Sequence, residues 1–447
     1  MNPLNVIRGF DPDLYAYFEK ELEHQRLSLS FIPDENSTSP LCAAIMGSVL
    51  VNTSKHTGYA LDAGLETLTA KRICELFKAD HANLRTISIE AASRCVFQSL
   101  TKRGDVVMSL DLRKKEHCNS ENLAFRFVNF SIDPKTQRLD MSAVEEQAKA
   151  CRPQMIVLSP INYPLEIDYA HFARIAKECG ALLWCDISQT AGLIAGGALP
   201  SPVPHADVVT FSMHGALQGP QASVILCKSD IANSIDRTVY MGGHSGLQTA
   251  QLAALEARIR EMQEPVYTEY AKAVVANAKA LGEGLKAGGL NIMCQGTDSH
   301  LILVDSKDCA LSSARGAQEM LAEAGVNVRI CSIETADPEV KFDAIRFSSL
   351  PATTRGASAS QLKEIGGYIA QFLRTPNADN LKHLRDMIAR ITVGLPTFFE
   401  YWLSDVVRDN LTKMSFMSSD STQIADSIHP TRLHALAKKL KKDNNTH

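Results

Sequence analysis

Residues 181–227 read ALLWCDISQTAGLIAGGALPSPVPHADVVTFSMHGALQGPQASVILC. They hold three apolar or β-branched runs that each predict a buried strand, ALLWCD (181–186), DVVTFSM (207–213) and ASVILC (222–227). Asp186 ends the first run, and His214 and Gly215 lie in the loop between the other two. Ligands of open α/β sheets collect beyond the carboxyl ends of the strands, so Asp186 and this loop are expected to face a crevice. The alternative for Asp186 is a buried structural aspartate that caps the next helix.

The same alternation of apolar runs and helical stretches extends upstream. Further strands are predicted at DVVMSL (105–110), FRFVNFSI (125–132) and QMIVLSP (154–160), and helices at 11–28, 142–150 and 170–179. This rhythm is typical of an α/β fold with a mostly parallel sheet wrapped by helices. The expected domains are a helical arm (1–40), a large α/β domain (41–285), a smaller α+β C-terminal domain (286–395) and a helical extension with a basic tail (396–447).

The composition is that of an ordinary globular protein. Hydrophobic residues make up 45% and charged residues 21% of the 447, and the net charge is −4, so no global basic field attracts nucleic acid. No segment approaches 18 uncharged apolar residues, so no membrane span is expected and the protein is predicted to be cytoplasmic.

The eleven cysteines form no C-x-x-C pair, so reduced thiols and no metal site are expected. The tail RLHALAKKLKKDNNTH (432–447) is either a solvated terminus or a docking element for an acidic partner.

Five further blocks occur in order along the chain, EKELEHQRLSLSFIPDENSTSP, HANLRTISIEAAS, RGDVVMSLDL, GTDSHLILVD and IRFSSLPATTRG. With residues 186–226 they resemble the serine hydroxymethyltransferase family over residues 5–395. One glycine-rich loop could arise anywhere, but ordered blocks are specific to a family. The resemblance implies a dimeric, fold-type I transferase-like architecture of the kind that binds pyridoxal phosphate.

The resemblance implies roles for individual positions of this chain. Asp186 falls where the family's aspartate pairs with the pyridinium nitrogen and keeps the ring an electron sink. His117 falls near the histidine that stacks on the ring, and Arg355 matches the arginine that grips the substrate carboxylate. Gly242 and Gly243 match a pair that approaches the phosphate of the neighbouring subunit. Ser212 and His214, at the end of the second strand, complete the implied cofactor-binding set.

The chain departs from the family at the Schiff-base lysine, because Gly215 stands at that position. The resemblance therefore implies that no internal aldimine forms and that ordinary glycine hydroxymethyltransferase activity is absent. Lys228 does not replace the missing amine, since it is expected at the far end of the following strand. No catalytic residue is assigned; His214 remains a possible base.

Further departures affect the other cofactor contacts. Where the family's phosphate loop reads Ser-Gly-Ser, this chain reads Ser88-Ile89-Glu90, and a carboxylate there would repel a phosphate dianion. Gln189 replaces a ring-contacting histidine, and Gln221 replaces the arginine of a Gly-Pro-Arg turn. The loop with the family's tyrosines and acidic catalyst is shortened to NTSKHTGYALDAG (52–64), although His56 or Tyr59 could occupy part of that space.

Three functions are compatible with this pattern. The first is a catalytically degenerate family member that serves as a ligand-binding or regulatory subunit, as a homodimer or paired with an active serine hydroxymethyltransferase. The second is an enzyme with altered chemistry, in which pyridoxal phosphate binds only non-covalently and weakly, if at all, and His214 acts as base. The third is a site for an unphosphorylated ligand, such as a small amino acid or a folate-like ring held by Arg355.

Overall fold

The computed structural model describes residues 3–52, 61–110, 125–242, 247–310 and 313–410. They divide into two compact units. His24–Ser404 contains both large sheets, and the described residues of Met1–Glu23 and Asp405–His447 form the other unit. The domain boundaries expected at residues 40, 285 and 395 stay predictions.

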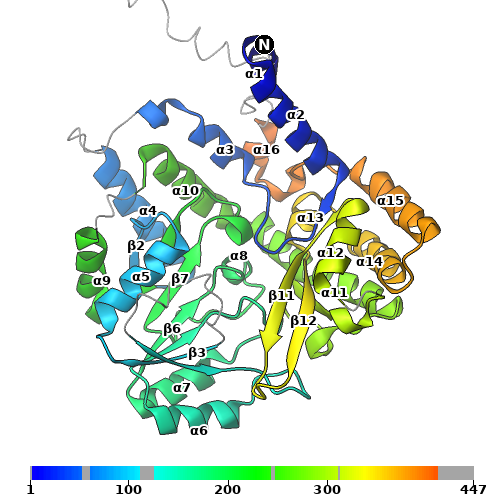
Figure 1. The fold of residues 1–447 in the computed structure, drawn as a ribbon. Helices are drawn as coiled ribbons and strands as arrows, with labels where there is room; N and C mark the ends of the chain where they lie inside the picture. The colour runs from blue at the N-terminus through cyan, green and yellow to red at the C-terminus, as the bar shows by residue number, and fades with distance from the viewer. Residues whose placement is uncertain (1–2, 53–60, 111–124, 243–246, 311–312, 411–447) are drawn as a thin grey trace, which may run out of the picture. The chain divides into compact units, whose positions relative to one another are not determined.

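A seven-stranded sheet forms the core of the larger unit (Figure 1), in the order β2-β8-β7-β6-β5-β3-β4. Its strands are β2 (His81–Asn83), β3 (Val106–Leu110), β4 (Arg126–Phe130), β5 (Met155–Leu158), β6 (Leu182–Asp186), β7 (Val208–Ser212) and β8 (Ser223–Cys227). Neighbours from β4 to β7 run parallel, whereas β8 is antiparallel to both β7 and β2. The carboxyl ends of five strands therefore meet at one edge of the sheet.

Helices cover both faces of this sheet, so alternate side chains of the strands enter two different hydrophobic cores. Leu183 and Cys185 of β6 pack with helices α4, α6, α7 and α10, whereas Trp184 packs with α5 and α9. Strands buried on both faces explain the continuous apolar runs in the sequence. The covering helices are α4 (Leu61–Phe77), α5 (Ile89–Leu100), α6 (Met141–Cys151), α7 (Tyr169–Cys179), α8 (Ala191–Ala195), α9 (Ser229–Met241) and α10 (Thr249–Met262).

A second, smaller α+β region follows α11 (Pro265–Ala287). Its antiparallel sheet has the order β11-β12-β9, and one face packs against α11, α12, α14 and α15. Its elements are β9 (Leu301–Asp305), α12 (Ala314–Glu323), β10 (Val326–Asn327), β11 (Arg329–Glu334), β12 (Lys341–Ser348), α13 (Leu350–Thr354), α14 (Ala359–Arg374) and α15 (Ala378–Thr392). Earlier in the chain, β1 (Leu29–Ser30) pairs with β10, and α3 (Pro40–Met46) packs against α10.

The unit at the chain ends contains α1 (Pro3–Phe10), most of α2 (Pro12–Leu27) and α16 (Asp405–Asp409). Several large apolar side chains on α1 and α2 are exposed, among them Phe10 and Tyr17 at 89% and 76%. No described helix has the length and apolarity needed to cross a membrane. The ten described cysteines form no disulfide with one another.

The predicted fold class is confirmed. Each strand expected between residues 105 and 227 is present, shortened by one or two residues at its ends, as usual where hydrogen-bonding ladders begin and stop. The helices expected at 11–28, 142–150 and 170–179 correspond to α2, α6 and α7.

Candidate functional site

The strand ends gather polar side chains at the carboxyl edge of the central sheet. Leu158 of β5 pairs with Cys185 of β6, so Ser159 comes directly beside Asp186. On the other side, Asp186 pairs with Thr210 of β7, two residues before Ser212. Asp186 thus lies at the carboxyl end of a central parallel strand, and the crevice expected beyond it stays a prediction.

Asp186 is 5% exposed and uses only one of its carboxylate oxygens within the chain. Oδ1 accepts a hydrogen bond from the Ser188 amide at 2.9 Å, whereas Oδ2 is buried without a partner. The following helix α8 begins after Thr190, so Asp186 does not cap it. A buried carboxylate oxygen with no donor indicates a missing partner at this place.

The loop after β7 is held by hydrogen bonds from distant parts of the chain. The Ser212 amide donates to the Ser188 hydroxyl at 3.1 Å, and the His214 amide donates to the Ser212 hydroxyl at 3.2 Å. Asn36 donates through its side-chain amide to the Gly215 carbonyl at 3.2 Å. His214 is exposed, and its role as a base stays a prediction.

Gly215 adopts a backbone conformation that suits glycine. Its φ is +70°, and a Cβ atom there would lie 3.3 Å from the Asp34 carbonyl oxygen. An L side chain at this position therefore meets both a left-handed backbone and a close neighbour. Lys228 lies at the opposite end of the sheet, where its Nζ pairs with Asp207 at 2.6 Å, so the far-end position predicted for it is confirmed.

A buried polar network fixes the backbone just after Gly215. Arg258 donates through Nε to the Leu217 carbonyl at 2.6 Å and through Nη2 to the Gln218 side chain at 2.5 Å. Its third partner is Glu261, at 2.8 Å. Gln218, in turn, donates to the Thr354 hydroxyl at 2.9 Å. The loop at the lysine position is therefore built into the core and has a defined conformation.

Helix α5 begins beside the same edge of the sheet. Ser223 pairs with Ser212 across β8 and β7, and its hydroxyl donates to the Ser88 carbonyl at 2.8 Å. Ser88 caps α5 by accepting from the Ala91 amide, and Glu90 lies exposed in the first turn. Glu90 thus supplies negative charge to a helix N-terminus, which would otherwise attract an anion.

The guanidinium of Arg355 is engaged with the protein backbone. Nη1 donates to the Ser28 carbonyl at 2.7 Å and Nε donates to the Pro396 carbonyl at 3.0 Å. Nη2 lies 3.3 and 3.4 Å from the carbonyls of Arg26 and Leu395. Each nitrogen of its fork thus has a carbonyl partner, and the carboxylate-gripping role of Arg355 stays a prediction.

Gln189 and His300 connect the end of β6 to the start of β9 in the small sheet. The Gln189 amide nitrogen donates to Asp34 Oδ1 at 2.6 Å, and the Gln189 carbonyl lies 2.6 Å from His300 Nε2. Burial lowers the pKa of His300 to about 4, so this imidazole is neutral at neutral pH. Neither Asp34 nor His300 was identified from the sequence, because their partners are more than 100 residues away.

Five buried polar atoms without partners come from this one neighbourhood. They are Ser159 Oγ, Asn162 Oδ1, Asp186 Oδ2, Gln189 Oε1 and Arg346 Nε. Arg346 belongs to the group because its Nη2 donates to the Ile161 carbonyl at 3.1 Å. Native proteins leave few buried polar groups unpaired, so the concentration of such atoms here marks this edge as the candidate binding site.

The remaining predicted site residues lie at its margins or outside the described residues. Gly242 follows α9 and is exposed, whereas His117, Gly243, His56 and Tyr59 fall outside the described residues. Gln221 is exposed, and its carbonyl accepts from Gln251 at 3.4 Å. No group of three or more metal-ligating side chains is found among the described residues.

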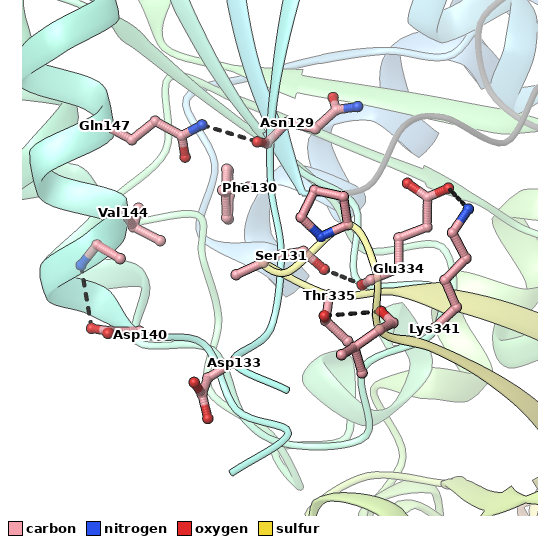
Figure 2. Close-up of a pocket in the computed structure, with 14 residues that line it drawn as sticks. Asn129, Phe130, Ser131, Asp133, Asp140, Val144, Gln147, Glu334, Thr335 and Lys341 are labelled. Carbon is pink, nitrogen blue, oxygen red and sulfur yellow. Dashed lines mark hydrogen bonds and ion pairs between the residues drawn. The ribbon is translucent and has the colours of Figure 1, made fainter. Parts of the chain in front are cut away.

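A separate cavity of about 280 Å³ lies between the end of β4, α6 and the β11–β12 turn (Figure 2). Asp140 accepts from the amides that begin α6, and Asp133 accepts from those of Lys135 and Thr136. Glu334 pairs with Lys341 at 3.4 Å. The carboxylates of this cavity therefore already serve local partners.

Comparisons with known proteins place this chain in a family. Residues 7–369 match the family model described as serine hydroxymethyltransferase. Serine hydroxymethyltransferases of Polynucleobacter asymbioticus and Polynucleobacter necessarius subsp. necessarius are each 33% identical to the chain over 411 residues. These alignments cover 88% of this chain and 99% of each relative.

The fold and the strand-end site define a protein of the fold-type I, pyridoxal-phosphate transferase class. Within that class the chain belongs to the serine hydroxymethyltransferase family. Members of this family normally bind pyridoxal phosphate and generally form oligomers.

The described residues fit this cofactor only in part. The unpartnered Asp186 Oδ2 suits a protonated ring nitrogen. Gly215 offers no amine for an imine, and Glu90 places a carboxylate in the first turn of α5, where it would repel a phosphate group. The described residues therefore fit the ring nitrogen of the cofactor but not its covalent and phosphate contacts.

Replacing Gly215 by alanine is expected to lower the free energy of unfolding by about 1 to 2 kcal/mol, because the new Cβ meets an unfavourable φ and the Asp34 carbonyl. Gly197→Ala is the matched control, since Gly197 has a φ of +72° and nothing within 4 Å of its Cβ position. Chemical denaturation of both variants separates the two causes. Equal losses would show that the Asp34 contact does not matter.

Proposed function

We propose that this protein is a member of the serine hydroxymethyltransferase family that does not perform the lysine-dependent reaction and instead binds a small ligand non-covalently, as a binding or regulatory subunit. The observation that carries the proposal is the Gly215 loop. It has no amine at the lysine position, and its left-handed backbone is tied into the core by Asn36 and by the network around Arg258.

Two other features support loss of the family reaction. Glu90 at the start of α5 places a carboxylate where an anionic group would need neutralisation. Arg355 donates to four backbone carbonyls, so every nitrogen of its guanidinium already has a partner. Together they argue against tight binding of pyridoxal phosphate and of an amino acid through this arginine.

The proposal includes assembly as a dimer, either with a second copy or with an active serine hydroxymethyltransferase. Exposed apolar side chains on α1 and α2, including Phe10, Leu14 and Tyr17, favour burial against another chain. Tyr240 and Met241, at the end of α9 beside Gly242, are likewise exposed. Copurification of an active family member with a tagged form of this protein would support the mixed dimer, and a pure homodimer would restrict the proposal to self-assembly.

The purified protein, incubated with pyridoxal phosphate and reduced with borohydride, is expected to carry no stoichiometric pyridoxyl group on any single lysine. Peptide mass spectrometry provides the measurement, because reduction makes any imine permanent. An active serine hydroxymethyltransferase treated in parallel is the positive control and should be labelled at one lysine. One fully labelled lysine in this protein, or serine cleavage at a rate comparable with the control, would overturn the proposed function.

A further inference from the structure

The cavity beside β4 and α6 has walls from both regions of the larger unit (Figure 2). The end of β4 and the first half of α6 form one wall, and the β11–β12 turn (334–341) forms the other. The walls are joined beside it, because Ile132 forms a β-bridge with Thr335 and the Ser131 hydroxyl donates to the Glu334 carbonyl. A volume of about 280 Å³ is at the small end of ligand pockets and suits a small molecule.

The lining of this cavity combines apolar and charged side chains. Phe130 and Val144 are 4% and 2% exposed and contribute apolar surface. Figure 2 shows Asp140 on the α6 side and Glu334 on the β11 side, with Phe130 between them. A hollow that has apolar side chains between its carboxylates can hold the hydrocarbon part of a cation as well as its charge, which a flat acidic surface cannot do.

The charged lining residues carry an excess of negative charge. Three carboxylates, Asp133, Asp140 and Glu334, stand against the single ammonium of Lys341, which gives a net charge of −2. Lys341 is 57% exposed and lies 3.4 Å from Glu334, so it offsets one carboxylate at most. The hydrogen bond from the Thr136 amide lowers the pKa of Asp133, and this side chain is therefore ionised at neutral pH.

Asp133 and Asp140 each keep one carboxylate oxygen for a ligand. Oδ1 of each accepts hydrogen bonds from two backbone amides that follow it in the chain. Among the described residues no hydrogen bond reaches Oδ2 of either aspartate. An ammonium group suits these oxygens, since it has three N–H donors and no acceptor.

We propose that this cavity binds an aliphatic diamine, whose hydrocarbon chain lies on the apolar lining and whose ammonium groups pair with the two aspartates and with Glu334. The charge of such a dication equals the negative excess of the lining. The bound diamine would connect the two walls and stabilise their junction, which makes the cavity an effector site. The cavity shares no lining residue with the strand-end site, so this inference goes beyond the proposed function and does not rest on it.

The test is isothermal titration of the full-length protein with putrescine, butylamine, butanediol and succinate, which share a four-carbon chain and differ in charge. Putrescine is expected to bind saturably and about fivefold more tightly than butylamine, because one more partly solvated ion pair contributes at most about this factor. Butanediol and succinate are expected not to bind. Saturating putrescine should also raise the unfolding temperature, since it binds only the folded protein.

Asp140→Asn removes one carboxylate and keeps the cap of α6, because asparagine caps a helix as well as aspartate does. It is expected to weaken putrescine binding about fivefold. Asp168→Asn is the matched control, because Asp168 is the exposed N-cap of α7 and does not line the cavity. It should bind putrescine as the unmodified protein does. Lys341→Gln removes the lining cation and is expected to tighten binding.

Several results would overturn the inference. Equal binding of putrescine and butanediol, undiminished binding by Asp140→Asn, or weaker binding by Lys341→Gln would each do so. Equal losses in Asp140→Asn and Asp168→Asn would show attraction to the general negative charge of the protein, and no binding of putrescine would show that water fills the cavity. None of these results concerns the lysine position, so the proposed function would stand. A labelled lysine in the borohydride experiment would overturn the proposed function and leave diamine binding unaffected.

Discussion

Arg258→Met is expected to cost about 3 to 5 kcal/mol of unfolding free energy, because it leaves the Glu261 carboxylate buried without its cationic partner. The side chains of Arg258 and Glu261 are 2% and 7% exposed. Burial by itself opposes the charge on Arg258, and the Glu261 carboxylate offsets this enough that the pKa of Arg258 is raised. The guanidinium also stacks over the Tyr267 ring, 4.9 Å from its centroid.

The double variant Arg258→Met/Glu261→Met removes the stranded carboxylate and is expected to recover most of that loss. Arg174→Met is the exposed control, because the pairs of Arg174 with Glu145 and Glu178 are solvated, and it should leave the denaturation midpoint nearly unchanged. Guanidinium chloride unfolding of the three variants measures their free energies of unfolding. A single Arg258→Met variant as stable as the parent would show that the ion pair does not hold the loop after Gly215.

Gly284→Ala is expected to cost about 3 kcal/mol, at the upper end of overpacking costs, because helices α11 and α14 approach closely at this glycine. A Cβ at Gly284 would lie 2.0 Å from the Lys363 carbonyl oxygen and 3.1 Å from the Gly366 Cα. Both contacts are with backbone, so rotating a side chain cannot relieve them. The two helices would have to separate, and both contribute to the hydrophobic core of the smaller α+β region.

Gly282→Ala is the matched control for this variant. Gly282 lies one half-turn earlier on α11 and has nothing within 4 Å of its Cβ position. Alanine there should stabilise the protein by as much as about 1 kcal/mol, through helix propensity alone. Thermal or chemical unfolding of both variants measures the difference, and a Gly284→Ala variant as stable as Gly282→Ala would contradict the close helix packing.

The strands and the position of Asp186 could be predicted because both depend on local sequence. Each run of apolar residues is long enough to be a strand buried on both faces, and a parallel sheet orders its carboxyl ends at one edge. The place of Lys228 followed from the same reasoning, since a residue just beyond an antiparallel strand lies at the opposite edge. These predictions required no knowledge of distant contacts.

The partners of Arg355 could not be predicted in this way. Their carbonyls belong to Ser28 and Pro396, and no residue pattern around Arg355 reveals that these segments meet it. The same holds for Asp34, which reaches Gln189 and Gly215 from another part of the chain. Backbone carbonyls are present at every residue, so the sequence cannot tell which of them will lie near a given guanidinium.

The sequence by itself determined the α/β class, the strand-end aspartate and the absence of an amine at position 215, because apolar periodicity and residue identity are local properties. Only the tertiary structure decided that Gly215 has a left-handed backbone against Asp34, that Arg355 is occupied by carbonyls, and that unpaired polar atoms gather beside Asp186. The reason is physical: a hydrogen-bond partner is selected by packing of distant segments, and its free energy depends on the burial that this packing creates.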